Sequence, residues 1–421
     1  MDEKKVLVIA YYFPPMGLSG VQRISKFVKY LPDYNWKPII LTTGDTDFYA
    51  FDETLLYELP NDLDVYRTAE TKKTTENKNR IVKFPSYLKQ RVGRAILQTL
   101  YQPDSKIKWM KPALALGEEI IKEHKPDVIF ATAPPFTDFL IAKELSKKFD
   151  IPFVVDYRDV WVDNPFHFYA TPFHKSYSIN LEKEILTHAE KAVVVTRRTK
   201  ELLVKRYPFI SHSDINIIPH GYDAEDFQGI GDYKPGQTKF IITHSGLFQD
   251  DRTPKYFFKA LSNFIKKHPE SESVIEARFV GIMRPNHTKM IKKYGLEKVV
   301  NCLGYMNHPD TVRQLIGSDI LWLMLNDNVR SPGKLFEYFG ARKPILACVP
   351  EGVIRRLALD TKAAIATEPN DVTAIESAIE TFYNLKKKNN LPLPKKEYIE
   401  QFNRAKLTGE LAKVLALATN L

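Results

Sequence analysis

Short apolar runs alternate with amphipathic stretches along this chain, and no other feature of the sequence limits its fold as strongly. In the first half, the apolar runs are residues 5–10, 38–42, 127–131, 152–156 and 192–196, and helical patterns occupy residues 24–31, 112–124, 137–148 and 177–189. Strands separated by helices are typical of a parallel sheet that helices cover on both faces. The pattern therefore predicts a doubly wound α/β domain.

A second series of apolar runs begins near the middle of the chain. Its members are residues 239–244, 277–281, 299–303, 320–325, 344–349 and 363–367, again with helical stretches between them. A chain of 421 residues is also too long for one ordinary domain. We expect two doubly wound domains, residues 1–222 and 223–395, with a polar, glycine-bearing linker at 221–237. A C-terminal helix within residues 396–421 is expected to pack back on the first domain.

Neither a secretory leader nor a membrane-spanning helix is expected, because no apolar run approaches the roughly 20 residues that a spanning helix needs. The two cysteines, Cys302 and Cys348, each lie within an apolar run, where a small buried side chain is expected. This usage predicts neither a structural disulfide nor a zinc site, and it indicates the cytoplasm as the compartment.

Most of the formal net charge of +10 comes from one stretch, residues 72–111. Eleven basic and two acidic residues give this stretch a net charge of +9, and Phe84, Tyr87 and Trp109 lie among them. Each Lys or Arg near an anionic leaflet contributes on the order of 1 kcal/mol, and aromatic residues add apolar burial. The stretch predicts a basic aromatic insertion that docks on an anionic membrane. A solvated loop and a nucleic-acid patch are the alternatives.

The segment Ser331–Ala341 carries the strongest functional signal. It follows the apolar run 320–325, and Ser-Pro-Gly before good helix formers predicts a loop that opens into a helix. Free amides and the positive end of the helix dipole bind phosphate, and Lys334 adds a cation. Helical spacing brings Gly333 and Glu337 close to Lys334, so phosphate donors and a carboxylate for sugar hydroxyls share one pocket. A capped surface helix with solvated side chains is the alternative.

Two clusters follow strands of the first domain. The glycines of segment 17–20 allow a phosphate or a sugar to approach the backbone, but their spacing is not the dinucleotide pattern, which disfavours nicotinamide binding. Asp156, Arg158 and Asp159 lie where another strand ends. Charges there are costly unless they pair or bind a ligand, so they are a candidate site. A local Arg–Asp ion pair that only fixes the loop is the alternative.

In the second domain, Gly246 ends the first strand and Arg252 follows shortly after it. A guanidinium can chelate a diphosphate in a bidentate way that a lysine cannot. Tyr305 follows the apolar run 299–303 and is a candidate to flank a nucleotide base, although an aromatic side chain at such a place is as often only packing.

Four segments, taken in order, resemble successive signatures of the retaining glycosyltransferases of family 4. They are Tyr12–Arg23, Asp156–Trp161, Ile218–Asp223 and Ser331–Ala341, and together they span nearly the whole chain. The resemblance implies the GT-B fold, in which two Rossmann-like domains face each other across a cleft. It also implies that the second domain holds most of the nucleotide-sugar donor and that the first holds the acceptor.

The resemblance further implies roles for individual residues. Glu337 would contact the donor ribose, the backbone from Gly333 to Leu335 would hold the diphosphate, and segment 17–20 would approach the donor phosphates from the first domain. Arg252 and Lys334 would neutralise the leaving group, so no metal is expected. The predicted substrate-binding residues are Gly17, Ser19, Gly20, Gly246, Arg252, Tyr305, Ser331, Gly333, Lys334, Leu335 and Glu337. The predicted catalytic residues are Arg158, Asp159 and Asp156, of which Asp159 or Asp156 would orient the acceptor hydroxyl.

Two positions depart from the family pattern. The usual E-x7-E pair places seven residues between two glutamates, so its first glutamate would stand at the position that Val329 occupies here. The position after the acceptor-domain strand is often histidine in the family and is Arg158 in this chain. The identity of the donor sugar and the details of the acceptor step are therefore left open.

The resulting prediction is an enzyme, a metal-independent retaining glycosyltransferase of bacterial-type surface polysaccharide or glycoconjugate synthesis. Its expected partners are a nucleotide sugar, which serves as co-substrate in place of any cofactor, a glycan or lipid-linked acceptor, and an anionic membrane surface, with no nucleic acid. The expected location is the cytoplasm, peripherally on the inner face of the cell membrane. The alternatives are a nucleotide-sugar epimerase of GT-B fold and a non-catalytic nucleotide-binding GT-B paralogue.

Overall fold

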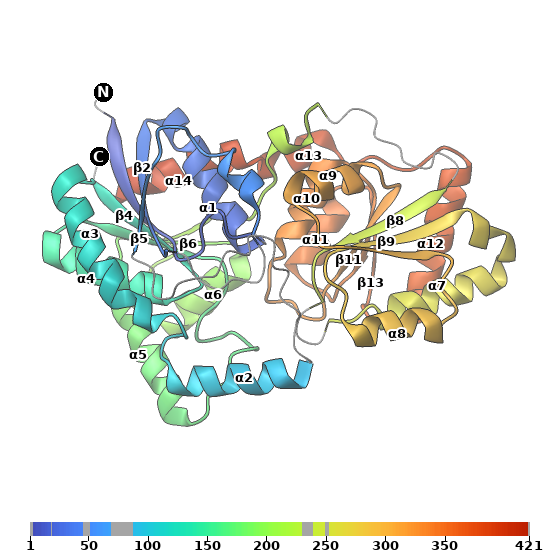
Figure 1. Ribbon diagram of the computed structural model, residues 1–421, viewed down its shortest axis with the longest axis horizontal. Helices are drawn as coiled ribbons and strands as arrows, with labels where there is room; N and C mark the ends of the chain where they lie inside the picture. The colour runs from blue at the N-terminus through green and yellow to red at the C-terminus, as the bar shows by residue number, and fades with distance from the viewer. Residues whose placement is uncertain are drawn as a thin grey trace. The chain divides into compact units, whose positions relative to one another are not determined.

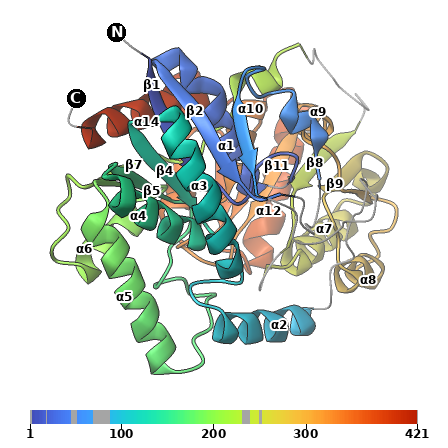
Figure 2. The same cartoon turned by 60° about the vertical axis from the view of Figure 1, so that its left-hand side comes forward.

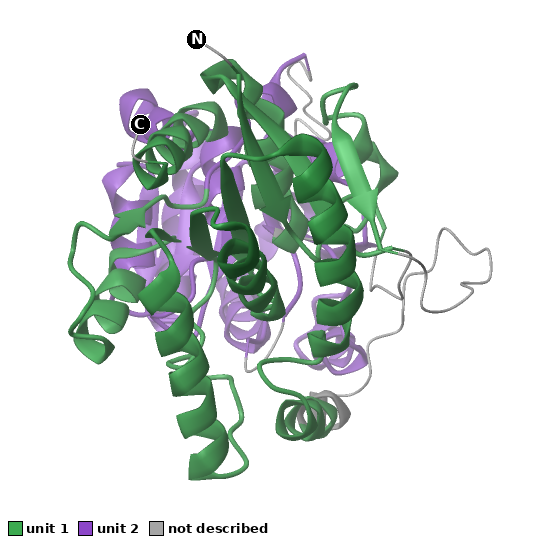
Figure 3. Cartoon of the chain, turned by 90° about the vertical axis from the view of Figure 1, so that its left-hand side faces the viewer, with its two compact units in different colours: residues 1–220, 404–421 green, residues 221–403 purple. Residues whose placement is uncertain are grey.

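The computed structural model describes residues 3–17, 19–44, 51–68, 87–229, 239–248 and 252–419 (Figure 1). The chain forms two compact units, which Figure 3 shows in separate colours. Unit 1 contains residues 1–220 and 404–421, and unit 2 contains residues 221–403.

Unit 1 is built on a parallel sheet of seven strands in the order β3-β2-β1-β4-β5-β6-β7. The strands are β1 (Lys4–Ile9), β2 (Trp36–Thr42), β3 (Asp64–Arg67), β4 (Val128–Ala133), β5 (Phe153–Tyr157), β6 (Lys191–Val194) and β7 (Ile215–Ile217). Every residue of β4 and β5 is buried, as expected for central strands of a sheet covered on both faces. The predicted doubly wound α/β fold is confirmed for this unit.

Helices cover both faces of this sheet (Figure 2). The helices of unit 1 are α1 (Ser19–Tyr30), α2 (Tyr87–Leu100), α3 (Met110–His124), α4 (Thr137–Phe149), α5 (Pro172–His188), α6 (Arg197–Arg206) and α14 (Arg404–Ala418), of which α2 lies away from the sheet. The last of these comes from the end of the chain and packs on α1. A Cβ at Gly409 of α14 would lie 2.8 Å from the Tyr34 ring, and the Tyr34 hydroxyl donates to the Ala405 carbonyl at 2.8 Å. The glycine therefore permits the close approach of α14 to the segment after α1.

Unit 2 is built on a parallel sheet of six strands in the order β10-β9-β8-β11-β12-β13. The strands are β8 (Phe240–Ser245), β9 (Ile275–Val280), β10 (Val300–Gly304), β11 (Ile320–Met324), β12 (Ile345–Cys348) and β13 (Ala364–Thr367). The helices are α7 (Lys255–Lys267), α8 (Pro285–Lys293), α9 (His308–Ile316), α10 (Gly333–Ala341), α11 (Val353–Asp360), α12 (Val372–Lys387) and α13 (Lys396–Ile399). The second doubly wound fold is thus also confirmed.

Aromatic side chains fill the core of unit 2 on one face of its sheet. The Trp322 ring of β11 stacks on Phe257 of α7 with centroids 4.2 Å apart, and its Nε1 donates to the Cys348 sulfur at 3.2 Å. The prediction of a buried cysteine is correct for Cys348 and wrong for Cys302, which is exposed on β10. β10 is an edge strand, so its side chains lack a neighbouring strand on one side. Both cysteines are free.

Two predicted segments differ in detail. The first part of the expected linker is ordered: Tyr222 donates its N–H to the Phe402 carbonyl at 3.0 Å, and Asp223 caps a 3-10 helix, Ala224–Phe227. Residues 230–238 lie outside the described residues. The single helix expected from residue 396 is interrupted, because Asn403 has an extended backbone between a second 3-10 helix, Glu400–Phe402, and α14.

The structure describes only part of the predicted basic insertion. Lys72, Lys73, Lys78, Arg80 and Lys83 lie outside the described residues, whereas the second part of the insertion forms α2, a helix that the sequence did not predict. None of the helices in the described part of the chain has both the length and the apolar character needed to cross a bilayer.

Candidate functional site

In unit 2 the predicted residues meet where β8 and β11 end and α10 begins. Gly246 follows β8 with φ at +108°, a backbone conformation that side-chain-bearing residues rarely adopt. A Cβ at this position would lie 2.8 Å from the Lys334 Nζ. The missing side chain therefore leaves room for the Lys334 ammonium directly beside the end of β8.

His244 of β8, which the sequence analysis did not single out, is the next polar neighbour of Lys334. Its Nδ1 lies 2.9 Å from the Trp322 carbonyl and its Nε2 lies 3.4 Å from the Lys334 Nζ. Because a carbonyl only accepts, Nδ1 carries the proton and Nε2 is free to accept from the ammonium. Burial, and then the charge of Lys334, hold the pKa of His244 well below its usual range, so the ring is neutral.

Lys334 and Arg252 form a small cationic centre. Burial, and then the nearby charge of Arg252, lower the pKa of Lys334 to about 7, although Glu337 acts in the opposite direction. A buried lysine whose charged form is disfavoured by a neighbouring guanidinium provides a place where an anion is favourable. This electrostatic arrangement is the central property of the unit 2 cluster.

The start of α10 adds backbone donors to this centre. Pro332 precedes the helix without a side-chain cap, and Gly333 is its first residue. The N–H of Leu335 bonds to the Pro332 carbonyl at 3.2 Å, and the Leu335 side chain is buried in the core of unit 2. The Ser331 hydroxyl is buried in the loop and has no hydrogen-bond partner in the structure. An unsatisfied buried hydroxyl is unusual in a folded protein and is suited to a ligand.

Hydrogen bonds to the sheet fix α10 in position. The Tyr338 hydroxyl donates to the Trp322 carbonyl of β11 at 3.1 Å and accepts the Ser245 N–H of β8 at 3.1 Å. One side chain of α10 thus connects the two strands whose ends carry the site. The position of the start of α10 is therefore fixed by the core of unit 2 as well as by the loop that precedes the helix.

Glu337 lies one helical turn after Lys334 and retains a little exposure. Its Oε1 is 3.5 Å from the His308 Nε2, at the start of α9. Tyr305 is half-buried in the loop between β10 and α9, so it and His308 belong to the same connection. The predicted ribose ligand therefore lies in the cluster, and a histidine that the sequence analysis missed contacts it.

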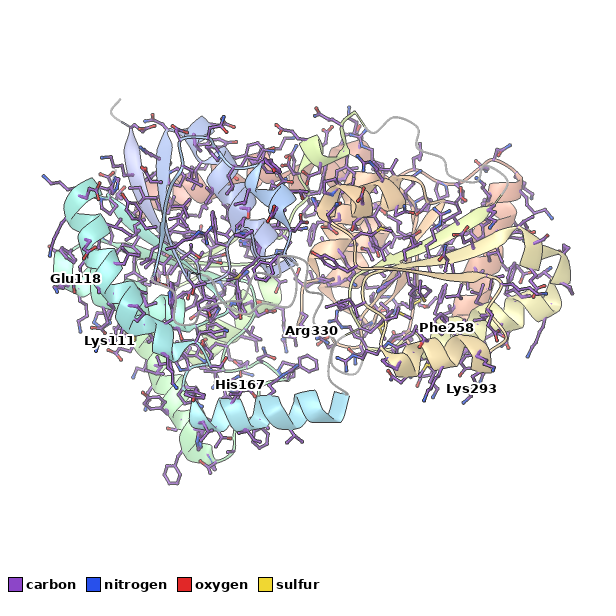
Figure 4. The ribbon with its side chains drawn as sticks, viewed as in Figure 1. Lys111, Glu118, His167, Phe258, Lys293 and Arg330 are labelled. Atoms are coloured by element: carbon purple, nitrogen blue, oxygen red, sulfur yellow. The ribbon has the colours of Figure 1, made fainter. Side chains whose placement is uncertain are left out.

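The loop before α10 contains the position where the family carboxylate is missing. Asp327 accepts the amides of Val329 at 3.1 Å and Arg330 at 2.9 Å, and its carboxylate pairs with the Arg330 guanidinium at 2.7 Å. An aspartate that bonds to amides further along the chain is a common turn former. Val329 is thus held in a turn organised by a carboxylate two residues earlier, and Figure 4 labels Arg330 within this loop.

In unit 1, Asp156 is fully buried in β5 and its carboxylate is fully engaged. The Arg23 guanidinium of α1 binds both oxygens, at 2.8 and 3.0 Å, and the Thr132 hydroxyl of β4 donates at 2.8 Å. Arg23 also donates to the carbonyls of Ile218 and Pro219. An Arg–Asp ion pair, the alternative to a site, is thus present, but it is not local, because Arg23 is 133 positions away from Asp156 in the sequence. This geometry favours a positioning role for Asp156.

Arg158 follows β5 and is also buried. It donates to the carbonyls of Gly20, at the start of α1, and Pro134, after β4, and burial lowers its pKa. Asp159 is half-buried beside it and raises that pKa again. Arg158 and Gly20, which were predicted separately, are therefore brought together at the carboxyl edge of the sheet.

The other residues predicted in segment 17–20 lie at the same place. Gly17 is buried in the loop after β1, and Ser19 begins α1, although its side chain is outside the described part. A Cβ at Gly20 would lie 3.6 Å from the Arg158 guanidinium, an ordinary contact distance. A side chain at position 20 would therefore fit within unit 1, so packing inside this unit does not require glycine there.

The sequence analysis missed a buried carboxyl group in unit 1. Asp138 lies in the first turn of α4 and accepts the Tyr11 N–H at 2.9 Å, and its second oxygen is buried without a hydrogen-bond partner among the described residues. Burial raises the pKa of Asp138 well above its usual range. The sequence does hold one signal for this residue. Thr137 and Asp138 are polar residues that come soon after the apolar run 127–131, and Asp156 likewise lies where an apolar run ends.

The chain was also compared with known proteins. Residues 58–226 match the family model described as Glycosyltransferase Family 4. No curated protein matched the chain in sequence.

Several solved structures share the fold at low sequence identity. Sucrose-phosphate synthase from Thermosynechococcus elongatus has a TM-score of 0.68 at 13% identity, over 98% of each chain. Anabaena Alr3699/HepE in complex with UDP has a TM-score of 0.65 at 14% identity, over 98% of this chain and 100% of that chain. A glycosyltransferase from Rickettsia africae has a TM-score of 0.67 at 16% identity, over 99% of each chain. The chain therefore has the GT-B fold of glycosyltransferases, and its predicted resemblance to family 4 of these enzymes is confirmed.

Proposed function

We propose that this protein transfers a sugar, with retention of configuration, from a nucleotide-diphosphate sugar to a glycan or lipid-linked acceptor, and that it needs neither a metal nor a further cofactor. The observation that carries the proposal is the cationic centre of unit 2. Lys334 and Arg252 lie beside the uncapped start of α10, and Glu337 follows one turn later. The start of α10 can therefore bind both the phosphate groups and the sugar hydroxyls of one ligand.

This centre suits the departure of a nucleoside diphosphate. The bond from the sugar to the β-phosphate oxygen breaks and leaves negative charge on that oxygen, which Lys334, Arg252 and the first amides of α10 stabilise. The start of α10, with Lys334, is already held by the core through Tyr338, so it needs little rearrangement during the reaction. Fixed cations of this kind can take the place of a metal ion.

Unit 1 is proposed to position the acceptor. Asp159 is the candidate to orient the acceptor hydroxyl, because Asp156 is fully engaged by Arg23 and Thr132. Arg158 and the Arg23–Asp156 pair are proposed to hold the loop that carries Asp159. The reaction is proposed to belong to surface polysaccharide or glycoconjugate synthesis, with the enzyme attached peripherally to the anionic inner face of the cell membrane.

The test is a transfer assay with purified protein, a panel of nucleotide-diphosphate sugars and a lipid-linked acceptor pool. HepE binds UDP, so UDP-sugars are the first donors to try. We expect release of the nucleoside diphosphate together with a sugar-bearing product whose anomeric configuration matches the donor. The complete absence of transfer and of donor hydrolysis across the panel would refute the proposal.

Two other functions make different predictions in the same assay. A nucleotide-sugar epimerase would convert the donor without any acceptor, whereas a transferase would not. A non-catalytic paralogue, for which the absence of a glutamate at Val329 is the main argument, would bind nucleotide without turnover. Product analysis with and without acceptor separates these cases from sugar transfer.

A further inference from the structure

Helix α2 has its apolar side turned to solvent. Val92, Ile96 and Leu100 are spaced four residues apart, so they form one stripe, and Leu97 lies next to it. These four side chains are between 45% and 68% exposed. A surface helix normally turns such a stripe toward the core, so the arrangement of α2 is the reverse of the usual one.

The polar side of α2 faces the protein. Gln98 accepts the Phe168 N–H at 2.9 Å, and its amide nitrogen lies 3.2 Å from the His167 Nδ1. Gln102, just after the helix, accepts the Ser178 hydroxyl of α5 at 2.9 Å. Figure 4 labels His167 beside α2. These hydrogen bonds fix the rotation of the helix, so its apolar stripe is held outward.

A second apolar group is exposed on the segment to which α2 is attached. Phe168, in the loop before α5, and Tyr177, on α5, are about half exposed, and Phe173 at the start of α5 is 84% exposed. Figures 1 and 2 show α2 and the start of α5 at the same end of unit 1. We call the seven side chains the docking face: Val92, Ile96, Leu97, Leu100, Phe168, Phe173 and Tyr177.

The charged residues in the segments that carry the docking face are mostly basic. Residues 87–111 contain six basic residues and one acid, and residues 164–181 contain Lys175 and no acid. The acid is Asp104, whose carboxylate accepts the amide and hydroxyl of Thr137 and the Lys106 amide, so it is already engaged. Arg94 and Lys175 are exposed. The surroundings are therefore cationic and complement an anionic surface.

We infer that the docking face inserts into the surface of an anionic lipid bilayer and so holds unit 1 against the membrane that carries its acceptor. This inference rests on the proposed function, which includes peripheral attachment to the membrane, and it names the side chains that insert. Exposed Leu, Ile, Phe and Tyr side chains with adjacent Lys and Arg are the composition of a helix that lies in the membrane interface. The acceptor class that fits is a sugar chain linked to a lipid anchor.

A lipid surface fits this face better than a protein partner. Protein interfaces that exclude water usually have few charged residues at the centre and a polar rim of mixed charge. Here the exposed charges of Arg94 and Lys175, on the same helices as the apolar residues, are both positive, which favours lipid headgroups. Phe173, at the start of α5, is 84% exposed and is suited to reach the acyl boundary.

The test is co-sedimentation of the full chain with vesicles of phosphatidylcholine alone or of equal parts phosphatidylcholine and phosphatidylglycerol. We expect binding to the anionic vesicles only, and weaker binding at high salt. The double variant Ile96→Glu/Leu100→Glu, and separately Phe173→Glu, should lower the affinity about tenfold or more. Leu393→Glu is the matched control, because Leu393 lies in unit 2 and its exposure of 74% is between those of Leu100 and Phe173. This variant should bind the vesicles as the wild type does.

Nucleotide binding measured by thermal shift is the second readout, and it should be the same in all these variants. It shows that each variant is folded and separates failure of docking from failure of the proposed function. Equal binding of wild type and the docking-face variants, or no preference of the wild type for anionic vesicles, overturns the inference. So does a dimer, seen by sedimentation velocity without lipid, that the double variant abolishes, because the face would then be a protein interface.

Discussion

At Asp156, both carboxylate oxygens are bound by buried partners, and this decides how the residue is to be tested. Removing one member of a buried ion pair leaves the other charge without compensation and costs about 3–5 kcal/mol. We therefore expect Arg23→Met to lower the free energy of unfolding of the chain by about that amount, as measured by urea denaturation. Asp156→Asn should act in the same direction.

Asp159→Asn is the control for this prediction. Asp159 is half-buried in the loop that follows β5, and its replacement should lower sugar transfer while leaving stability nearly unchanged. An Asp156→Asn variant of normal stability that has lost transfer would show instead that Asp156 acts on the acceptor directly.

Lys334 should take up a proton when a diphosphate binds. Its pKa is lowered to about 7 in the empty site, and a bound dianion favours the charged ammonium and raises that pKa. Above pH 7 binding therefore requires proton uptake, and affinity for a nucleotide-diphosphate sugar should fall as the pH rises from about 7 to 9. Below pH 6 the lysine is already charged and this dependence should vanish.

Calorimetric titration in buffers of different ionisation enthalpy measures the proton uptake directly. A nucleotide sugar is the right ligand, because its esterified diphosphate has no proton to lose in this range. Lys334→Arg supplies a cation that does not titrate, so it should bind without proton uptake. The same uptake in wild type and variant would assign it to another group.

The limits of the sequence are also visible at this scale. Lys334 and Glu337 were predicted because they are local to one helix start, and their clustering needs only helical periodicity. The partner of Asp156 is Arg23, and that of Lys334 is His244, each from a distant part of the chain. Pairings of this kind depend on the order of strands in the sheet, which a single sequence does not give.

At the scale of elements, α5 is joined to its neighbours by a buried glutamate. The Tyr207 hydroxyl, after α6, donates to the Glu182 Oε2 at 2.8 Å, and burial raises the pKa of Glu182 from 4.5 to about 8. Between these values the unfolded chain has lost this proton while the folded chain retains it. The stability due to this group is therefore full below pH 4.5 and is lost as the pH rises toward 8.

Glu182→Gln should flatten this dependence. We expect the free energy of unfolding of wild type to decrease between pH 5 and pH 8 by more than that of the variant, because glutamine has no proton to lose. Denaturant titrations at several pH values measure the difference. Glu184→Gln, on the exposed side of α5, should keep the wild-type decrease, and an identical decrease in Glu182→Gln would rule out this glutamate as its source.

The elements that the sequence predicted share a physical reason, as do those it missed. Strands such as β4 and β11 are buried on both faces and so appear as continuous apolar runs. The edge strand β3 carries Asp64 and Arg67 and has no such signal. Helix α2 does carry an apolar stripe at helical spacing, but that spacing alone does not tell that the stripe faces solvent and that polar side chains face the protein.

At the scale of the whole molecule, two doubly wound units supply two kinds of site. Unit 2 gathers cations and free amides at one edge of its sheet, and unit 1 gathers engaged carboxylates and an arginine at the corresponding edge of its own. The carboxyl edge of parallel strands is where such folds bind ligands. The account as a whole requires that the unit 2 centre bind a diphosphate.

Calorimetric titration of the full chain with the diphosphates of uridine, guanosine, adenosine, cytidine and thymidine tests this requirement most directly. The account predicts that at least one of them binds, that Lys334→Ala weakens this binding by about tenfold or more, and that Lys266→Ala, an exposed lysine of α7, leaves it unchanged. Binding of equal strength in wild type and Lys334→Ala, or binding of none of the five, would contradict it.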